Sequence, residues 1–253
     1  MKTLTCEINN QIALLRVNRP EVLNAVNRTV LEELQIFLEV TAQQQKLKAV
    51  ILSGTGEKSF IAGADIKEMQ TLDHHQMLDF CRLGQHVANL LESAPFLTIA
   101  AVNGYALGAG FELALGCDLI YASRLAQFGL PEVKLGLIPG FGGTQRLTSK
   151  VGLHIAKELM MSGRKLSAEE AKGLQIVNNV CEQPFLIDQC QQIATEILEN
   201  PFNAVIQAKL AINSYTNLSR SAALELERNK CAVSFATPES KNAISAFLKV
   251  RQP

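Results

Sequence analysis

The sequence contains no tryptophan, and aromatic residues make up only 6% of its 253 residues. Few rings leave few platforms on which a sugar can stack, so a glycosidase is disfavoured even though such enzymes also use paired carboxylates. The chain also lacks net charge, because 24 Lys and Arg balance 24 Asp and Glu. A neutral chain has no general electrostatic attraction to nucleic acid or to an anionic membrane.

Cysteine pairs with metal-ligand spacing are missing as well. The six cysteines are scattered without a C-x-x-C motif, so the sequence predicts neither a metal site nor a disulfide framework. We expect reduced thiols, as in a cytoplasm-like compartment. No apolar run reaches membrane-spanning length, and the first residues pass directly into strand-like sequence. We therefore expect no signal peptide, no transmembrane helix and a cytoplasmic location.

What the chain does have is a glycine-rich stretch at residues 103–118. Residues 96–102 form an apolar run typical of a buried strand, and the Ala/Leu run that ends at Gly116 has helical spacing. The stretch is therefore predicted to turn a strand into a helix. Such turns are common in α/β proteins, where many serve only for tight packing.

The same stretch places chemical groups at the start of the predicted helix. Gly108 and Gly110 lack a Cβ, so a ligand can approach the backbone. The first N–H groups of a helix have no partner within it and carry the positive end of its dipole. We therefore expect the N–H of Ala109 to be available for a negatively charged oxygen, with the carboxylate of Glu112 less than one turn away. A dinucleotide fingerprint fits poorly, because its third glycine would fall at Leu113.

Two further segments carry unusual residues. Residues 60–69 bring small side chains into a predicted helix with Asp65 at its N-cap, so Ala64 offers another N–H near a helix start. An ordinary capped turn explains that pattern equally well. Residues 126–146 contain five glycines and two prolines and cannot form one regular element. Within them Glu132 stands among apolar neighbours, where a buried carboxylate is either functional or held by a salt bridge or cap.

The rest of the chain indicates a mixed α/β fold followed by helices. Residues 3–8 and 12–17 read as a hairpin, 24–44 and 72–92 as helices, and 48–54 and 118–123 as strands. After Gly152 only residues 177–181 look like a strand. The change to pure helix at Asn200-Pro201 predicts a core of residues 1–200 and a helical region of residues 201–253. The apolar residues of that region predict a surface buried against another subunit. The predicted late helices span residues 155–161, 168–172, 186–199, 202–214, 221–235 and 238–250.

Taken together, residues 62–69, 103–118 and 128–146 closely resemble the enoyl-CoA hydratase/isomerase family, also called the crotonase family. The likeness extends over essentially the whole chain, including residues 234–239 and 246–248. The resemblance implies an α/β crotonase-like spiral of ββα turns with a helical C-terminal part. It also implies assembly as a homotrimer or a dimer of trimers, with an acyl-CoA as the partner rather than nucleic acid or a membrane.

The resemblance assigns roles to individual residues. Ala64 and Ala109 resemble the two backbone donors that hold the thioester oxygen, although some hydratases have Gly where Ala109 stands. Glu112 and Glu132 resemble the catalytic acids of true hydratases, and Gly140 the glycine that helps to place the reacting water. No bound cofactor or metal is implied, because CoA arrives with the substrate. The substrate-binding residues implied are Ala62, Asp65, Ile66, Lys67, Gly108 and Leu137.

Four residues have further, weaker assignments. Lys67 and Arg19 are candidate contacts for a CoA phosphate, and each is equally explained as a solvated charge. By family likeness, Phe247 and Arg251 would line a neighbouring subunit's site.

The implied reaction is the reversible syn addition of water to a trans-2-enoyl-CoA, which gives a 3-hydroxyacyl-CoA. Relatives that shift double bonds typically keep the acid at Glu132 and lose the one at Glu112, so having both favours hydration. A Δ3,Δ2-enoyl-CoA isomerase or another crotonase-type lyase is the nearest alternative. A non-enzymatic RNA-binding relative is a further one, which the neutral charge and the glutamate pair disfavour.

Overall fold

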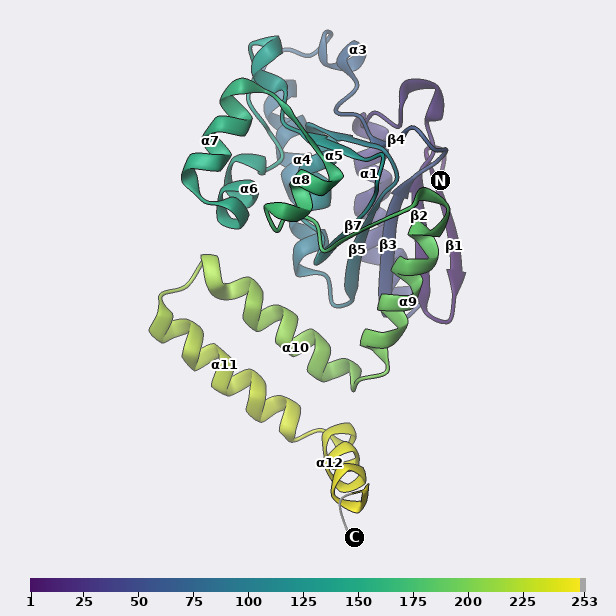
Figure 1. Cartoon of the computed structure of the whole chain (residues 1–253), viewed down its shortest axis with the longest axis vertical. Helices are drawn as coiled ribbons and strands as arrows, with labels where there is room; N and C mark the ends of the chain where they lie inside the picture. Colours follow the sequence, from purple (N-terminus) through teal and green to yellow (C-terminus); the bar gives the residue numbers. More distant parts are fainter. Residues whose placement is uncertain (251–253) are drawn as a thin grey trace. The chain divides into compact units, whose positions relative to one another are not determined.

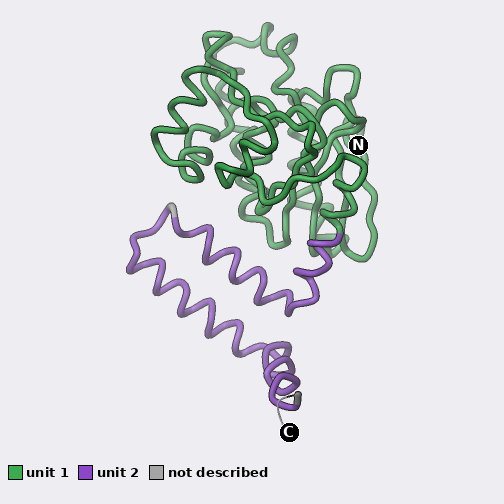
Figure 2. Tube along the Cα trace, viewed as in Figure 1, with its two compact units in different colours: residues 1–191 green, residues 192–253 purple. Residues whose placement is uncertain are grey.

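A computed structural model describes residues 1–250 of the chain. It consists of two compact units, one spanning Met1–Gln191 and one that begins at Gln192 (Figure 2). The break expected at Asn200-Pro201 lies inside the second unit, after the helix α9 (Leu186–Leu198).

The first unit contains a six-stranded sheet in the order β1-β2-β3-β5-β7-β10 (Figure 1). β1 and β2 form the predicted hairpin, and its turn residues Asn10 and Gln11 have φ of 48° and 64°, the left-handed values that a two-residue hairpin turn requires. All later pairs in this sheet are parallel. The strands are β1 (Leu4–Asn9), β2 (Ile12–Val17), β3 (Ala49–Gly54), β5 (Leu97–Val102), β7 (Leu119–Ser123) and β10 (Asn179–Cys181).

A second sheet has the order β4-β6-β8-β9 and is built from strands of three residues each. Successive strand pairs β3/β4, β5/β6 and β7/β8 place one strand in each sheet, so the chain winds as a spiral of ββ units with helices between them. These short strands were not predicted, because three residues are too few to show alternation. The strands are β4 (Ser59–Ile61), β6 (Tyr105–Leu107), β8 (Gln127–Gly129) and β9 (Lys165–Ser167).

The first long helix starts later than predicted. Asn27 caps α1 (Arg28–Ile36), which continues through η2 (Phe37–Thr41) into α2 (Ala42–Gln44). Asn24, the expected first residue, is buried in the left-handed region with φ 59°, and its side chain donates to the carbonyl oxygens of Thr55 and Ser59. Asn24 therefore binds the segment at residues 55–59 instead of starting a helix. The short η1 (Pro20–Val22) precedes it.

The glycine-rich stretch differs from its prediction in one respect. The strand β5 does not lead directly into the helix, because β6 lies between them, and α5 (Ala109–Leu115) starts at Ala109 with Gly108 at its N-cap. All seven residues of α5 are buried. A Cβ at Gly110 would lie 2.0 Å from the carbonyl oxygen of Ile61, so only glycine lets the start of α5 pack onto β4. This contact brings the two predicted donor segments, around Ala64 and Ala109, next to each other.

The remaining helices of the first unit lie between and after the sheet strands (Figure 1). The longest of them begins with a capping box formed by Asp73 and Gln76. They are α3 (Ile66–Met69), α4 (His74–Ser93), η3 (Glu132–Leu135), α6 (Gly143–Val151), α7 (Leu153–Ser162), α8 (Ala168–Gly173) and η4 (Gln183–Phe185).

The second unit is helical, as the sequence indicated. α10 (Phe202–Asn213) and α11 (Arg220–Phe235) run side by side, with η5 (Ser214–Thr216) between them and α12 (Pro238–Val250) after them (Figure 1). No residue of α11 is buried. Among the described residues, no helix of either unit has the length and apolar character needed to cross a membrane. Large exposed apolar side chains on the last two helices are Leu224, Val233, Phe235, Ile244, Phe247 and Leu248.

Candidate active site

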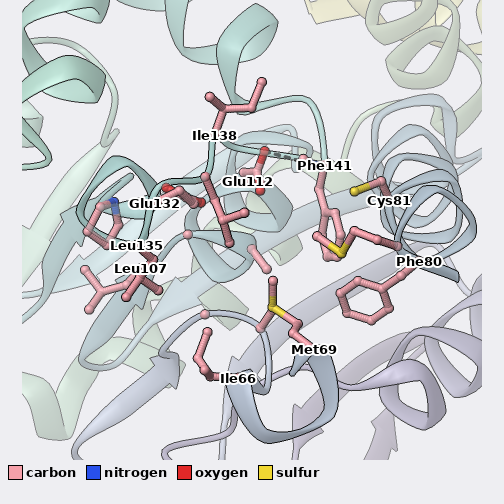
Figure 3. A pocket seen from close by; sticks show the side chains of 18 of the residues that line it. Ile66, Met69, Phe80, Cys81, Leu107, Glu112, Glu132, Leu135, Ile138 and Phe141 are labelled. Carbon is pink, nitrogen blue, oxygen red and sulfur yellow. Dashed lines mark hydrogen bonds between the residues drawn. The ribbon is translucent and has the colours of Figure 1, made fainter. Parts of the chain in front are cut away.

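A pocket of about 190 Å³ opens in the first unit among α3, α4, α5 and the segment that follows β8 (Figure 3). Most of the residues singled out from the sequence line it, although they come from segments far apart in the chain. Among those of the first unit, Arg19, Asp65 and Lys67 lie outside its lining. The predicted residues that do line it are Ala62, Ala64, Ile66, Gly108, Ala109, Glu112, Glu132, Leu137 and Gly140.

Glu112 reaches this pocket from the buried helix α5 and is only 1% exposed. Its Oε1 accepts hydrogen bonds from the N–H groups of Phe141 at 2.8 Å and Gly143 at 2.7 Å. Gly143 is the first residue of α6, so the carboxyl group meets the positive end of a helix. Burial raises the pKa of Glu112, while these backbone hydrogen bonds and the charge of Arg146 oppose the rise by stabilising the carboxylate.

Glu132 enters from the opposite wall, as the first residue of η3 after Pro131. Its Oε2 is buried, and no hydrogen-bond partner is found for it among the described residues. Burial raises the pKa of Glu132 to about 7, and the nearby charge of Glu112 adds to the rise. Both carboxyl groups therefore lie in one pocket (Figure 3), but Glu112 accepts from N–H groups of another segment, whereas the backbone N–H that opposes the rise at Glu132 is its own.

The two predicted backbone donors also line the pocket. Ala109 is the first residue of α5, where an N–H has no acceptor within its own helix. Ala64 forms an isolated parallel bridge with Val26, which uses the Gly63 carbonyl and the Asp65 N–H, so Ala64's own N–H points to the other side. Among the described residues, neither N–H is bonded to a protein acceptor.

Apolar side chains form the remaining walls. Phe80 and Phe141 meet edge to face with ring centroids 5.4 Å apart. The helix predicted over residues 72–92 includes Met77, Phe80 and Cys81, but helical periodicity alone does not tell a cavity wall from a core. The apolar and sulfur-containing lining residues are Met69, Met77, Phe80, Cys81, Leu107, Pro131, Leu135, Ile138 and Phe141.

Of the two residues proposed for CoA phosphate, only Lys67 is exposed, because the Arg19 side chain is largely buried. Asp65 caps α3 by accepting from the Lys67 N–H, and its other oxygen pairs with Arg19 at 3.0 Å. The Lys67 side chain is exposed. Phe247 is exposed on α12, and Arg251 lies outside the described residues.

Sequence reasoning missed the donors to Glu112. The Phe141 and Gly143 N–H groups lie 29 and 31 residues from the carboxylate in sequence. The glycine pair at 142–143, which opens a helix, was the available signal. No group of three or more metal-ligating side chains occurs within residues 1–250.

Two backbone N–H groups without acceptors, facing two carboxyl groups in an apolar pocket, make a site for chemistry next to a carbonyl. Comparison with known proteins agrees with this. Residues 7–253 match the family described as enoyl-CoA hydratase/isomerase. The short-chain-enoyl-CoA hydratase of Clostridium acetobutylicum is 40% identical over 100% of this chain and 97% of its own length. The crotonyl-CoA hydratase of Syntrophomonas wolfei is 38% identical over 99% of this chain and 96% of its own.

A solved structure extends the likeness to the fold. The crystal structure of an enoyl-CoA hydratase from Bacillus anthracis superimposes with a TM-score of 0.94 at 34% identity, covering 99% of this chain and 98% of that one. The chain thus belongs to the enoyl-CoA hydratase/isomerase family and has the crotonase fold. Both the family and the ββα spiral predicted from the sequence are confirmed.

Proposed function

We propose that this chain is an enoyl-CoA hydratase, a hydro-lyase that adds water in the syn sense to a trans-2-enoyl-CoA and yields a 3-hydroxyacyl-CoA. The observation that carries the proposal is the pair Glu112 and Glu132 in one pocket with the two backbone donors. The relatives named as hydratases support it, since they match the chain over nearly its whole length.

In the proposed reaction the N–H groups of Ala64 and Ala109 bind the thioester oxygen. Addition of hydroxide character at C3 turns the thioester into an enolate, and its negative charge develops on that oxygen. The two donors are held by the bridge at Val26 and by the start of α5, so they need little rearrangement. Loss of one such donor typically costs roughly 10² to 10³ in rate.

Different hydrogen bonding gives the two glutamates the roles of base and acid. Glu112 receives two N–H bonds that favour its carboxylate, so it is the group to orient and activate water as a base. Glu132 has a buried oxygen without a partner and a pKa of about 7, so it retains a proton that it can give to C2. Because the two charges interact, they titrate as a coupled pair.

Gly140 is proposed to help place the reacting water. It lines the pocket, and its backbone N–H is one of the groups that stabilise the Glu112 carboxylate. A water bound to Glu112 therefore lies within the reach of this second polar group.

The pocket walls indicate the kind of acyl group. Beyond the two glutamates the lining is apolar, which favours an acyl chain without a second charge. We propose that Ala62, Ile66, Gly108 and Leu137 contact the acyl-CoA, that Lys67 reaches a CoA phosphate from the rim, and that no cofactor besides the substrate's own CoA is required.

We also propose a homotrimer or a dimer of trimers, acting in the cytoplasm in fatty-acid β-oxidation. The exposed apolar side chains of α11 and α12, Phe247 among them, support burial against another copy. Light scattering on the purified chain tests this: a particle of three or six chains is expected, and a monomer contradicts it.

Ultraviolet absorbance with crotonyl-CoA tests the activity. Hydration removes the conjugated thioester band, so the band should bleach only when protein is present. With a 3-enoyl-CoA, growth of the band and no bleaching of crotonyl-CoA would point to an isomerase instead. A salt-dependent RNA gel shift in protein that bleaches neither substrate would favour the RNA-binding alternative.

A further inference from the structure

The loop that holds Glu112 is itself held by the long helix α4. The ring of Phe141 lies directly against Gly84 of α4, where a Cβ would come within 2.3 Å of the ring atoms, and packs on Phe80 one turn earlier. Side chains near the same helix then bind successive carbonyl groups of the loop. The Phe141 backbone is thus fixed on the side away from Glu112 as well as on the side facing it.

Gln85 of α4 binds the first of these carbonyls. Its Nε2 donates to the Gly140 oxygen at 2.9 Å. That oxygen belongs to the same planar peptide group as the Phe141 N–H, and in a trans peptide the two point in opposite directions. The peptide group therefore accepts from Gln85 at one end and donates to Glu112 at the other, and a hydrogen bond at one end strengthens the bond at the other.

Arg146 of α6 binds the next carbonyl. Its guanidinium donates to the Phe141 oxygen at 3.1 Å, to Asn89 at 2.5 Å and to Glu92 at 2.9 Å, the last two on α4. Its side chain is only 14% exposed. The following carbonyl, that of Gly142, accepts from the first turn of α6. Three consecutive carbonyls are thus anchored, and two of the anchors are side chains outside the pocket lining.

We infer that Gln85 and Arg146 are positioning residues: by anchoring the carbonyls of Gly140 and Phe141 to α4, they aim the backbone donors at Glu112. The inference rests on the proposed hydratase function, in which Glu112 must be ionised and oriented toward water. Neither side chain lines the pocket. Their removal should therefore lower kcat and leave the KM for crotonyl-CoA unchanged.

The pH profile separates this role from a merely structural one. The charged or titratable groups around Glu112 are Glu132 from η3, Cys81 from α4 and Arg146 from α6. Weaker N–H donation makes the Glu112 carboxylate less stable, so its pKa rises. The acid limb of kcat against pH should consequently move to higher pH.

The test uses Gln85→Met, a change of similar size that removes the donor without changing charge. Gln85 is exposed, so the variant should fold. The matched control is Gln44→Met on α2, also an exposed helical glutamine and outside the pocket. We expect kcat to fall about fivefold in Gln85→Met, as for loss of one hydrogen bond. The acid limb of kcat against pH should move to higher pH. Gln85→Lys restores a donor and should recover kcat in high salt, where its charge is screened.

Arg146→Lys keeps the charge but loses the forked guanidinium that joins α4 to the loop, so it should lower kcat more than Gln85→Met does.

If Gln85→Met has the same kcat as Gln44→Met, or loses kcat without a shift of the acid limb, the inference is overturned. If the wild type does not hydrate crotonyl-CoA, the proposed function fails but the inference can still be decided. An infrared titration of the Glu112 carboxyl band, assigned by its loss in Glu112→Gln, should then show a higher pKa in Gln85→Met. An unchanged pKa overturns the inference.

Discussion

The two glutamates of the pocket lie in different environments. On the α5 wall Glu112 is almost fully buried, yet two N–H groups hold one of its oxygens. On the η3 wall Glu132 lies among exposed residues such as Leu135 and Leu137, yet its inner oxygen has no partner among the described residues. Burial raises the pKa of both glutamates, but the N–H bonds to Glu112 oppose the rise there, whereas the charge of Glu112 adds to the rise at Glu132.

This contrast explains how two glutamates can act as a base and an acid at one pH. A carboxylate that accepts backbone N–H bonds is stabilised in its charged form, whereas one without partners is favoured in its neutral form. Substitutions and pH changes that remove or enlarge that difference should alter the rate and the stability.

Conversion of either carboxylate to an amide should have the largest effect. Glu112→Gln and Glu132→Gln keep shape and remove the charge or the proton, so we expect hydration of crotonyl-CoA to fall roughly 10³-fold in each. The check is the initial rate of bleaching. Full hydration by either variant contradicts the role given to that residue.

Ala109→Pro should come next. Proline lacks the N–H but is tolerated at the first position of a helix, and Ala109 has that place in α5. We expect kcat for hydration to fall roughly 10²-fold or more, with unfolding behaviour close to wild type. The control is Arg220→Pro, which also replaces the first residue of a helix, on α11 outside the first unit. A folded Ala109→Pro protein with full activity shows that this N–H is not a donor.

The dependence of kcat/KM on pH should report the loss of the proton from Glu132. With a pKa of about 7 caused by burial, Glu132 loses its proton above neutrality, so kcat/KM should fall roughly fivefold between pH 7 and pH 8. Rates across pH 5 to 9 in buffers of constant ionic strength measure this, with protein stability followed in parallel. A flat profile to pH 9 contradicts the assignment of Glu132 as the acid.

Glu132→Gln should gain stability although it loses activity. The folded pKa of Glu132 is raised, so the folded state binds more protons than the unfolded state between about pH 4.5 and 7 and loses stability as pH rises through that range. Glu132→Gln removes this cost and should be more stable than wild type at pH 8 by about 1 kcal/mol, allowing for solvent screening. The advantage should vanish near pH 4.

Urea unfolding at both pH values checks this, and Glu112→Gln is the matched comparison. Burial also raises the pKa of Glu112, but its N–H bonds oppose the rise, so its replacement should bring a smaller gain. A Glu132→Gln protein that is less stable than wild type at pH 8 would show that the carboxylate has a partner there.

The sequence was sufficient for the long elements and for most of the site. Strong helical periodicity located α4, α9, α10 and α12 to within about two residues, and the glycine pattern located the start of α5 and the neighbouring Glu112. These features are local, so a short window of residues is enough to determine where each helix begins and ends. The sites of Glu132 and Gly140 were reached through the family resemblance, and the pocket brings them together with Glu112.

What could not be predicted depends on contacts between distant segments. The strands β4, β6 and β8 exist because each pairs with the next, and no single strand has a pattern of its own. The N–H donors to Glu112 and the anchor Arg146 come from residues 141–146, and the anchor Gln85 comes from α4, both far from Glu112 in sequence. Asp65 and Lys67 were grouped with the pocket because they adjoin Ala64 in sequence, but Asp65 caps α3 and pairs with Arg19, and Lys67 is exposed.

The division of labour between the glutamates is tested most directly by proton exchange at C2, which needs no attack by water. Wild type, Glu112→Gln and Glu132→Gln are incubated with butyryl-CoA in D2O, and loss of the C2 proton signal is followed by NMR. The account predicts exchange in wild type, exchange that persists in Glu112→Gln, and none in Glu132→Gln. Exchange that survives in Glu132→Gln and disappears in Glu112→Gln would contradict it.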